Sequence, residues 1–145
     1  MSTVATVSDP LMALNFDEME ATIASLPAYA PEIVHHFAPG VYAREMRAEG
    51  GRWLTGKMHK TEHVNIIVGD VIIYNDEDKT ERRITGHACF VSKPGKRCAA
   101  LTIRPTIWTT IHVTNETDLA KLEAALIEPH HNPLLADALA GRMLE

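Results

Sequence analysis

The sequence has few cysteines and no long hydrophobic run. Its 145 residues include two cysteines, Cys89 and Cys98, which are too few for a disulfide framework, so a hydrophobic core has to stabilise the fold. No apolar stretch approaches the roughly 20 residues that a membrane-spanning helix needs. Residues 1–10 also lack the basic segment and apolar core of a secretion signal. We therefore expect a cytoplasmic protein in which both cysteines are reduced and buried.

Runs of basic residues are absent as well. There are 14 Lys and Arg against 19 Asp and Glu, and the net charge is -5. This balance argues against binding to nucleic acid or to an anionic membrane. Small molecules or other proteins are the expected partners, and the length predicts one domain over residues 1–145.

The middle of the chain consists of short extended runs separated by turn residues. These runs are 33–37, 41–47, 53–59, 63–68, 71–74, 82–85, 88–91, 97–103 and 106–113. The turn residues between them are Pro39-Gly40, Gly50-Gly51, Gly69-Asp70, 75–78 and Pro94-Gly95. Such spacing is typical of an antiparallel barrel or sandwich, here over about residues 33–114.

Helices are expected on both sides of this barrel. Asn15 or Asp17 can cap a helix whose apolar residues recur at helical spacing. Thr117 can cap a second helix over 118–127, and Asn132-Pro133 begins a third over 134–143, so residues 117–145 form a helical extension. Residues 1–14 show no clear period, which predicts a loose arm or a strand that docks elsewhere.

Residues 56–70 contain the most promising chemistry. If this segment is extended, Lys57, His59, Thr61 and His63 point to one face, and two imidazoles on one face are a candidate site. Alternatively, a turn at 60–62 places the two histidines on different strands, with Glu62 inward and His63 outward. The sequence leaves both alternatives open.

Together, the runs and residues 56–70 resemble the cupin superfamily, a double-sheet jelly-roll barrel, over residues 41–113. The first cupin motif has two histidines one residue apart, a glutamate a few residues later and a glycine seven residues after that. His59, Glu62 and Gly69 match this motif, whereas Lys57 replaces its first histidine.

The second cupin motif is a proline-glycine turn followed by a histidine three residues after the glycine. Pro94-Gly95 matches the turn, but Cys98 stands in place of the histidine. Cupins usually hold a divalent metal with these imidazoles and the carboxylate. The resemblance therefore implies a transition metal (Zn, Fe, Mn or Ni) at His59, at His63 or Glu62, and at Cys98.

The chain also resembles small single-domain cupins of bacteriophage genomes. Residues 56–63, 94–97 and 108–114 carry this resemblance, which names a fold and not a reaction. A bacteriophage origin would place the protein in the host cytoplasm.

Three further residues are candidates for the site. His112 shares a strand face with Trp108 and Thr110, with Ile107, Ile111 and Val113 on the other face, and it could act as a third ligand or as a general acid or base. Arg97 follows the proline-glycine turn, where a guanidinium could bind a carboxylate or phosphate. Lys57 is a second candidate contact for an anion.

The leading interpretation is a cupin that acts on a small anionic metabolite with a divalent transition metal, in a pocket at the barrel mouth. Glu62 or His112 would move a proton, and Arg97 or Lys57 would hold the anion. One alternative is a non-catalytic protein that sequesters a nucleotide-derived signal, as in phage counter-defence. Another is a virion structural or assembly protein. A homodimer is expected because cupins commonly pair.

Overall fold

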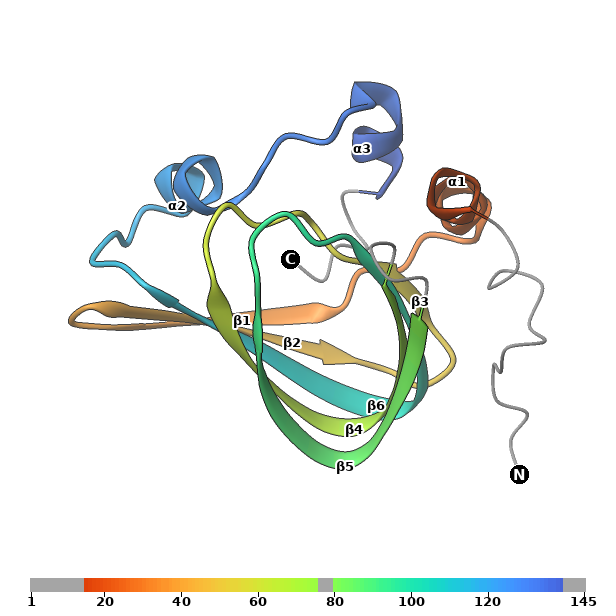
Figure 1. Cartoon of the computed structure of the whole chain (residues 1–145), viewed down its shortest axis with the longest axis horizontal. Helices are drawn as coiled ribbons and strands as arrows, with labels where there is room; N and C mark the ends of the chain where they lie inside the picture. The colour runs from red at the N-terminus through yellow and green to blue at the C-terminus, as the bar shows by residue number, and fades with distance from the viewer. Residues whose placement is uncertain (1–14, 76–79, 140–145) are drawn as a thin grey trace.

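In the computed structural model, which describes residues 15–75 and 80–139, an antiparallel sheet curls into a jelly-roll barrel with helices at one end (Figure 1). The strands are β1 (Glu32–Ala38), β2 (Val41–Ala48), β3 (Trp53–Thr55), β4 (His63–Asn75), β5 (Thr80–Ser92) and β6 (Cys98–Val113). The helices are α1 (Phe16–Ser25), α2 (Leu119–Leu126) and α3 (Pro133–Leu139). The strand order is β1-β2-β6-β4-β5, and β3 pairs with β6. The predicted all-β jelly roll with flanking helices is confirmed.

The three longest strands each join two of the predicted runs. The sequence predicted a turn at Gly69-Asp70, but β4 continues through it as a β-bulge, marked by register shifts against β6 on either side of Asp70. Gly69 has φ 149°, and a Cβ there would lie 2.7 Å from the Cα of Thr106. Only glycine fits this bend, which carries the strands around the curve of the barrel.

The predicted strand over 53–59 is too long. β3 ends at Thr55, and residues 56–62 form a loop that is tied to the end of α2. Lys60 N–H donates to the carbonyl of Leu126 at 2.7 Å, and Glu128 N–H donates to that of Met58 at 2.8 Å. His59 and His63 are therefore not on one strand, but they are not on different strands either, because His59 lies in the loop and only His63 is on a strand; the alternative is right only in that the chain bends between them. Its second part is wrong, because His63 is buried and Glu62 is exposed.

Alternation in β4 and β6 sets which side chains face into the barrel. As predicted, Trp108, Thr110 and His112 share one face, and all three are buried. Ile107 and Val113, on the other face of β6, are exposed, so the polar face is the inner one. Cross-strand pairs lie in rows that run from the rim inward: Tyr42 opposite His112, then Thr110 opposite Asn65, then Trp108 opposite Ile67. The barrel interior is thus polar at its rim and apolar below.

The helices gather at one end of the barrel (Figure 1). α1 is capped by Asn15, one of the two predicted caps, and Asn15 forms a capping box with Glu18. α2 is capped by Asp118 rather than by the predicted Thr117, and its buried leucines pack on Tyr42. No helix in the described part of the chain is long and apolar enough to cross a membrane.

Several predictions fall partly or wholly outside the described residues, namely the arm over 1–14, most of the turn over 75–78 and the third helix beyond Leu139. The prediction of two buried cysteines is wrong for Cys89. Alternation places Cys89 on the outer face of β5, where it is exposed, whereas Cys98 is half-buried.

Candidate functional site

Three imidazole rings meet at the rim of the barrel. His59 comes from the 56–62 loop, His63 begins β4, and His112 lies near the end of β6. The ring centroids of His59 and His63 are 4.0 Å apart, and His112 lies 5.2 Å from His59 and 5.0 Å from His63. Their exposed fractions are 6%, 7% and 2%, respectively. We call these residues the histidine trio.

Burial keeps two members of the trio neutral. Loss of solvation lowers the pKa of His112 to about 4, and repulsion from the charge of Arg44, and from His63 when that ring is protonated, adds to this effect. Burial also lowers the pKa of His63 below its usual value. Both rings are therefore uncharged at neutral pH, which is the form that binds a metal or accepts a proton.

Hydrogen bonds set the orientation of the trio. Nδ1 of His63 lies 3.2 Å from the carbonyl oxygen of Thr61, so Nδ1–H is the donor and Nε2 keeps its lone pair. Among the residues that the structure describes, Nδ1 of His112 and Oγ1 of Thr110 are buried without a hydrogen-bond partner. Buried polar atoms are normally satisfied, so this pair indicates a place for a bound polar group.

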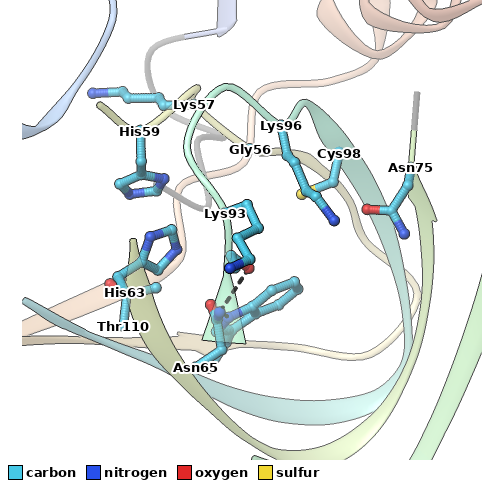
Figure 2. A pocket seen from close by; sticks show the side chains of 12 residues that line it. Gly56, Lys57, His59, His63, Asn65, Asn75, Lys93, Lys96, Cys98 and Thr110 are labelled. Carbon is cyan, nitrogen blue, oxygen red and sulfur yellow. Dashed lines mark hydrogen bonds between the residues drawn. The ribbon is translucent and has the colours of Figure 1, made fainter. Parts of the chain in front are cut away.

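Two members of the trio, His59 and His63, border a cavity of about 50 Å³, whereas His112 lines a neighbouring hollow. Figure 2 shows His59 and His63 on one side of it, Asn65 below, and Lys96, Cys98 and Asn75 on the far side. The lining residues include three lysines, Lys57, Lys93 and Lys96, and no aspartate or glutamate among those described. The cavity thus offers positive charge and hydrogen-bond donors.

Two larger hollows adjoin this cavity. One, of about 570 Å³, lies beneath the segment between α2 and α3 and shares Gly56 and Lys57 with the cavity. Another, of about 230 Å³, is lined by Tyr42, His112 and Lys57 among others. Lys57 contacts all three hollows and forms an ion pair with Glu123 of α2. It stands at their junction.

Two predicted site residues lie away from the trio. Glu62 is exposed and pairs with Lys93 at 2.9 Å, so the structure does not bring the predicted proton carrier to the cavity. Arg97 lines the 570 Å³ hollow and bonds Asp17 and Glu20 at 2.9 and 2.7 Å. Its guanidinium is already held by two carboxylates.

Cys98 lines the cavity, but on the side away from His59 and His63 (Figure 2). Burial raises the pKa of its thiol to about 12, so it is protonated at neutral pH and not a ready thiolate ligand. Among the described residues, no three His, Cys, Asp or Glu side chains already have the arrangement of a formed metal site.

Sequence reasoning missed several polar cavity residues, namely Asn65, Asn75, Ser92, Lys93 and Lys96. A signal for Asn65 was present. It is the one amide in the otherwise apolar stretch 64–68 and falls on the face of His63 by alternation.

The chain is similar in structure to a double-stranded β-helix protein from Klebsiella pneumoniae, with a TM-score of 0.51 and 14% identity over 89% of this chain and 100% of the other. It is also similar to DMSP lyase DddQ from Ruegeria pomeroyi, with a TM-score of 0.53 and 17% identity over 65% of this chain and 54% of the lyase. A salicylate 1,2-dioxygenase from Pseudoaminobacter salicylatoxidans gives a TM-score of 0.53 and 9% identity over 72% of this chain and 31% of the dioxygenase.

These similarities establish the fold, which is the double-stranded β-helix that the cupin resemblance implied. The chain spans about half of the lyase and a third of the dioxygenase. No protein-family model and no curated protein matches the sequence. The bacteriophage resemblance stays a prediction.

Proposed function

We propose that this protein is a small-molecule-processing cupin whose histidine trio holds a divalent transition metal and whose cavity takes a small anionic substrate. The convergence of three buried imidazoles from three separate segments carries the proposal. Cavities at barrel mouths commonly bind small molecules. Of the three lysines around the cavity, Lys57 and Lys93 pair with Glu123 and Glu62, and Lys96 forms no ion pair with a described residue, so Lys96 favours an anion most directly.

The donor set of the trio fits such an ion. With metal–nitrogen bonds of about 2 Å and tetrahedral angles, imidazoles that share one ion have centroids about 5 Å apart. The separations of 5.0 and 5.2 Å from His112 are near this value, whereas His59 and His63, at 4.0 Å, lie closer together, so the rings have to rotate before all three face one ion. Nitrogen donors suit zinc, iron or nickel better than magnesium.

When bound, such an ion supplies Lewis-acid polarisation of a substrate oxygen or an activated water. The chain itself provides the surrounding groups. Thr110 can donate a hydrogen bond from its buried hydroxyl, and Lys57 can attract the anionic end of the substrate from the junction of the hollows. In this proposal Lys57 keeps its predicted role, whereas Arg97, Glu62 and Cys98 do not take part.

Metal analysis of the purified protein tests the proposal, followed by titration of chelator-treated protein with zinc, iron, manganese and nickel. We expect one ion per chain, with binding lost in His63→Ala and in His112→Phe. His87→Ala, at an exposed position of β5, is the matched control and should bind normally. The absence of bound metal, together with no change in stability on adding any of the four ions, would overturn the proposal.

A second candidate function is non-catalytic binding of an anionic ligand. Lys57 and Cys98 occupy positions where the cupin motifs have metal-binding histidines, and this replacement favours a metal-free pocket. A thermal-shift screen of metal-free protein against nucleotides and sugar phosphates tests this function. Stabilisation, with the ligand recovered unchanged, would favour binding over catalysis.

A further inference from the structure

The cavity wall below the trio is built around one buried amide. Asn65 is 2% exposed, and its Oδ1 accepts a hydrogen bond of 2.9 Å from Nε1–H of Trp108. Its Nδ2 donates to Oγ of Ser92 at 2.8 Å. Because an indole N–H can only donate, the amide oxygen has to face Trp108 and the amide nitrogen has to face Ser92. The orientation of Asn65 is therefore fixed.

This orientation leaves two hydrogen-bond donors, one on each side chain, for a ligand. The oxygen of Asn65 is engaged by Trp108, whereas its Nδ2 carries a second hydrogen beyond the one that it donates to Ser92. The hydroxyl of Ser92 accepts from Asn65, so its own hydrogen is left to donate. Both side chains line the cavity, as does that of Lys96, which forms no ion pair with the described residues.

We propose that Asn65, Ser92 and Lys96 form a subsite that binds the carboxylate group of a small organic acid. This inference deepens the proposed function, because it names the substrate class of the same cavity, but it does not require the metal. A cavity of about 50 Å³ has room for a carboxylate-sized group, since about 10–15 Å³ of such space already holds one water. The rest of the ligand extends past Lys57 and Gly56 into the 570 Å³ hollow.

The subsite discriminates by charge and by donor count. A carboxylate accepts hydrogen bonds at both oxygens, and bonds between charged groups are about twice as strong as neutral ones. A neutral amide of the same shape turns its own NH₂ group towards the donors of the subsite. Some of these buried donors then have no acceptor. Such mismatches reduce binding at least about tenfold.

Trp108 provides a local readout of binding. The chain has two tryptophans, so Trp53→Phe leaves Trp108, in the cavity wall, as the only one. Metal-free protein with this substitution is titrated with acetate and oxalate, with acetamide and oxamide, and with inorganic phosphate. We expect a saturable change in emission with at least one carboxylate, and binding at least about tenfold weaker for the matching amide.

Asn65→Asp tests the residue itself. Aspartate has the same shape and can still accept from Trp108, but it turns the donor that faces the cavity into a negative charge. We expect carboxylate binding to weaken at least about tenfold. Asn115→Asp is the matched control, because this exposed residue changes by the same charge far from the cavity. Lys96→Met is a second variant that leaves the amide network intact and should also weaken carboxylate binding.

Four results would count against the carboxylate subsite. If metal-free protein responds to no carboxylate, the subsite is overturned, while the metal proposal still stands or falls on its own titration. A response to phosphate alone overturns the assignment to carboxylates. Unchanged binding in Asn65→Asp removes Asn65 from the subsite. If that variant does not fold, unchanged binding in Lys96→Met overturns the proposal.

Discussion

Arg97 donates a hydrogen bond of 2.7 Å to Glu20, a carboxylate that is 1% exposed. The same guanidinium bonds Asp17 and lies over the ring of Phe16, 4.4 Å from its centroid. It thereby joins α1 to the turn that precedes β6. The residue that the sequence suggested as an anion contact holds two parts of the fold together.

Arg97→Met should therefore destabilise the protein without removing ligand binding. The substitution leaves the carboxylate of Glu20 buried without its closest cation, which should lower the free energy of unfolding by about 3 kcal/mol. Urea unfolding measures this loss, and Lys93→Met, which removes an exposed cation, should cause no measurable change. Unaltered stability combined with lost anion binding would instead support the original prediction for Arg97.

Gly69→Ala should destabilise the protein more than Gly86→Ala does. The two glycines are paired across β4 and β5, and both have positive φ, but a Cβ at Gly69 would meet the backbone of Thr106, whereas at Gly86 it would meet nothing within 4 Å. We expect a loss of about 3 kcal/mol for Gly69→Ala and about 1 kcal/mol for Gly86→Ala. Thermal or urea unfolding compares the two, and equal losses would contradict the tight contact at the bulge.

The stability of the protein should depend on the ionisation of Asp70. Two hydrogen bonds from Arg83, of 3.0 and 2.8 Å, lower the pKa of this carboxyl below its usual value of 3.8. Above about pH 5 the carboxylate is charged in both states and its pairing stabilises the fold. As the pH falls below about 4, the unfolded chain takes up the proton first, and the stabilisation is lost.

Asp70→Asn should therefore have a lower free energy of unfolding than the parent protein at pH 7. This difference in free energy should become smaller as the pH falls through about 4 towards the pKa of Asp70 in the folded state. Urea unfolding at pH 7, 5 and 3 measures this difference. A difference that is the same at all three values would show that the charge of Asp70 does not contribute.

Glu62→Gln should leave metal binding, carboxylate binding and stability unchanged. Glu62 is exposed and its partner Lys93 is exposed as well, so the pair contributes little. The measurements are the metal titration and the Trp108 emission assay, in parallel with His63→Ala. A loss of either binding activity in Glu62→Gln would show that this carboxylate reaches the cavity and restore its predicted catalytic role.

Local patterns in the sequence predicted the strand runs and α1 well, but not how the runs connect. Gly69 illustrates the reason. A glycine-aspartate pair is a strong turn signal, and only the approach of Thr106, which is distant in sequence, shows that this glycine bends a continuous strand. The length of β4 was therefore beyond local reasoning.

The site was predicted in part, for similar reasons. Alternation along β6 correctly placed His112 on an inner face, because the period of a strand is local. The surroundings of Arg97 were not predictable, because its partners Asp17 and Glu20 lie some 80 residues earlier in the chain. The sequence predicted that His59 and His63 are close because both lie on one extended strand. They are close, but because the loop over 56–62 folds His59 against His63.

The loop that carries His59 forms an isolated β-bridge with Ile127. This contact makes part of the support for the trio a late product of folding. The strands that carry His63 and His112 can pair before the end of α2 exists as ordered chain, but two of the backbone hydrogen bonds that hold residues 58–60 need residues 126–128, while a third, from Gly95 N–H to the carbonyl of His59, does not. During synthesis, the barrel can therefore be assembled while the loop that carries His59 still lacks two of these bonds.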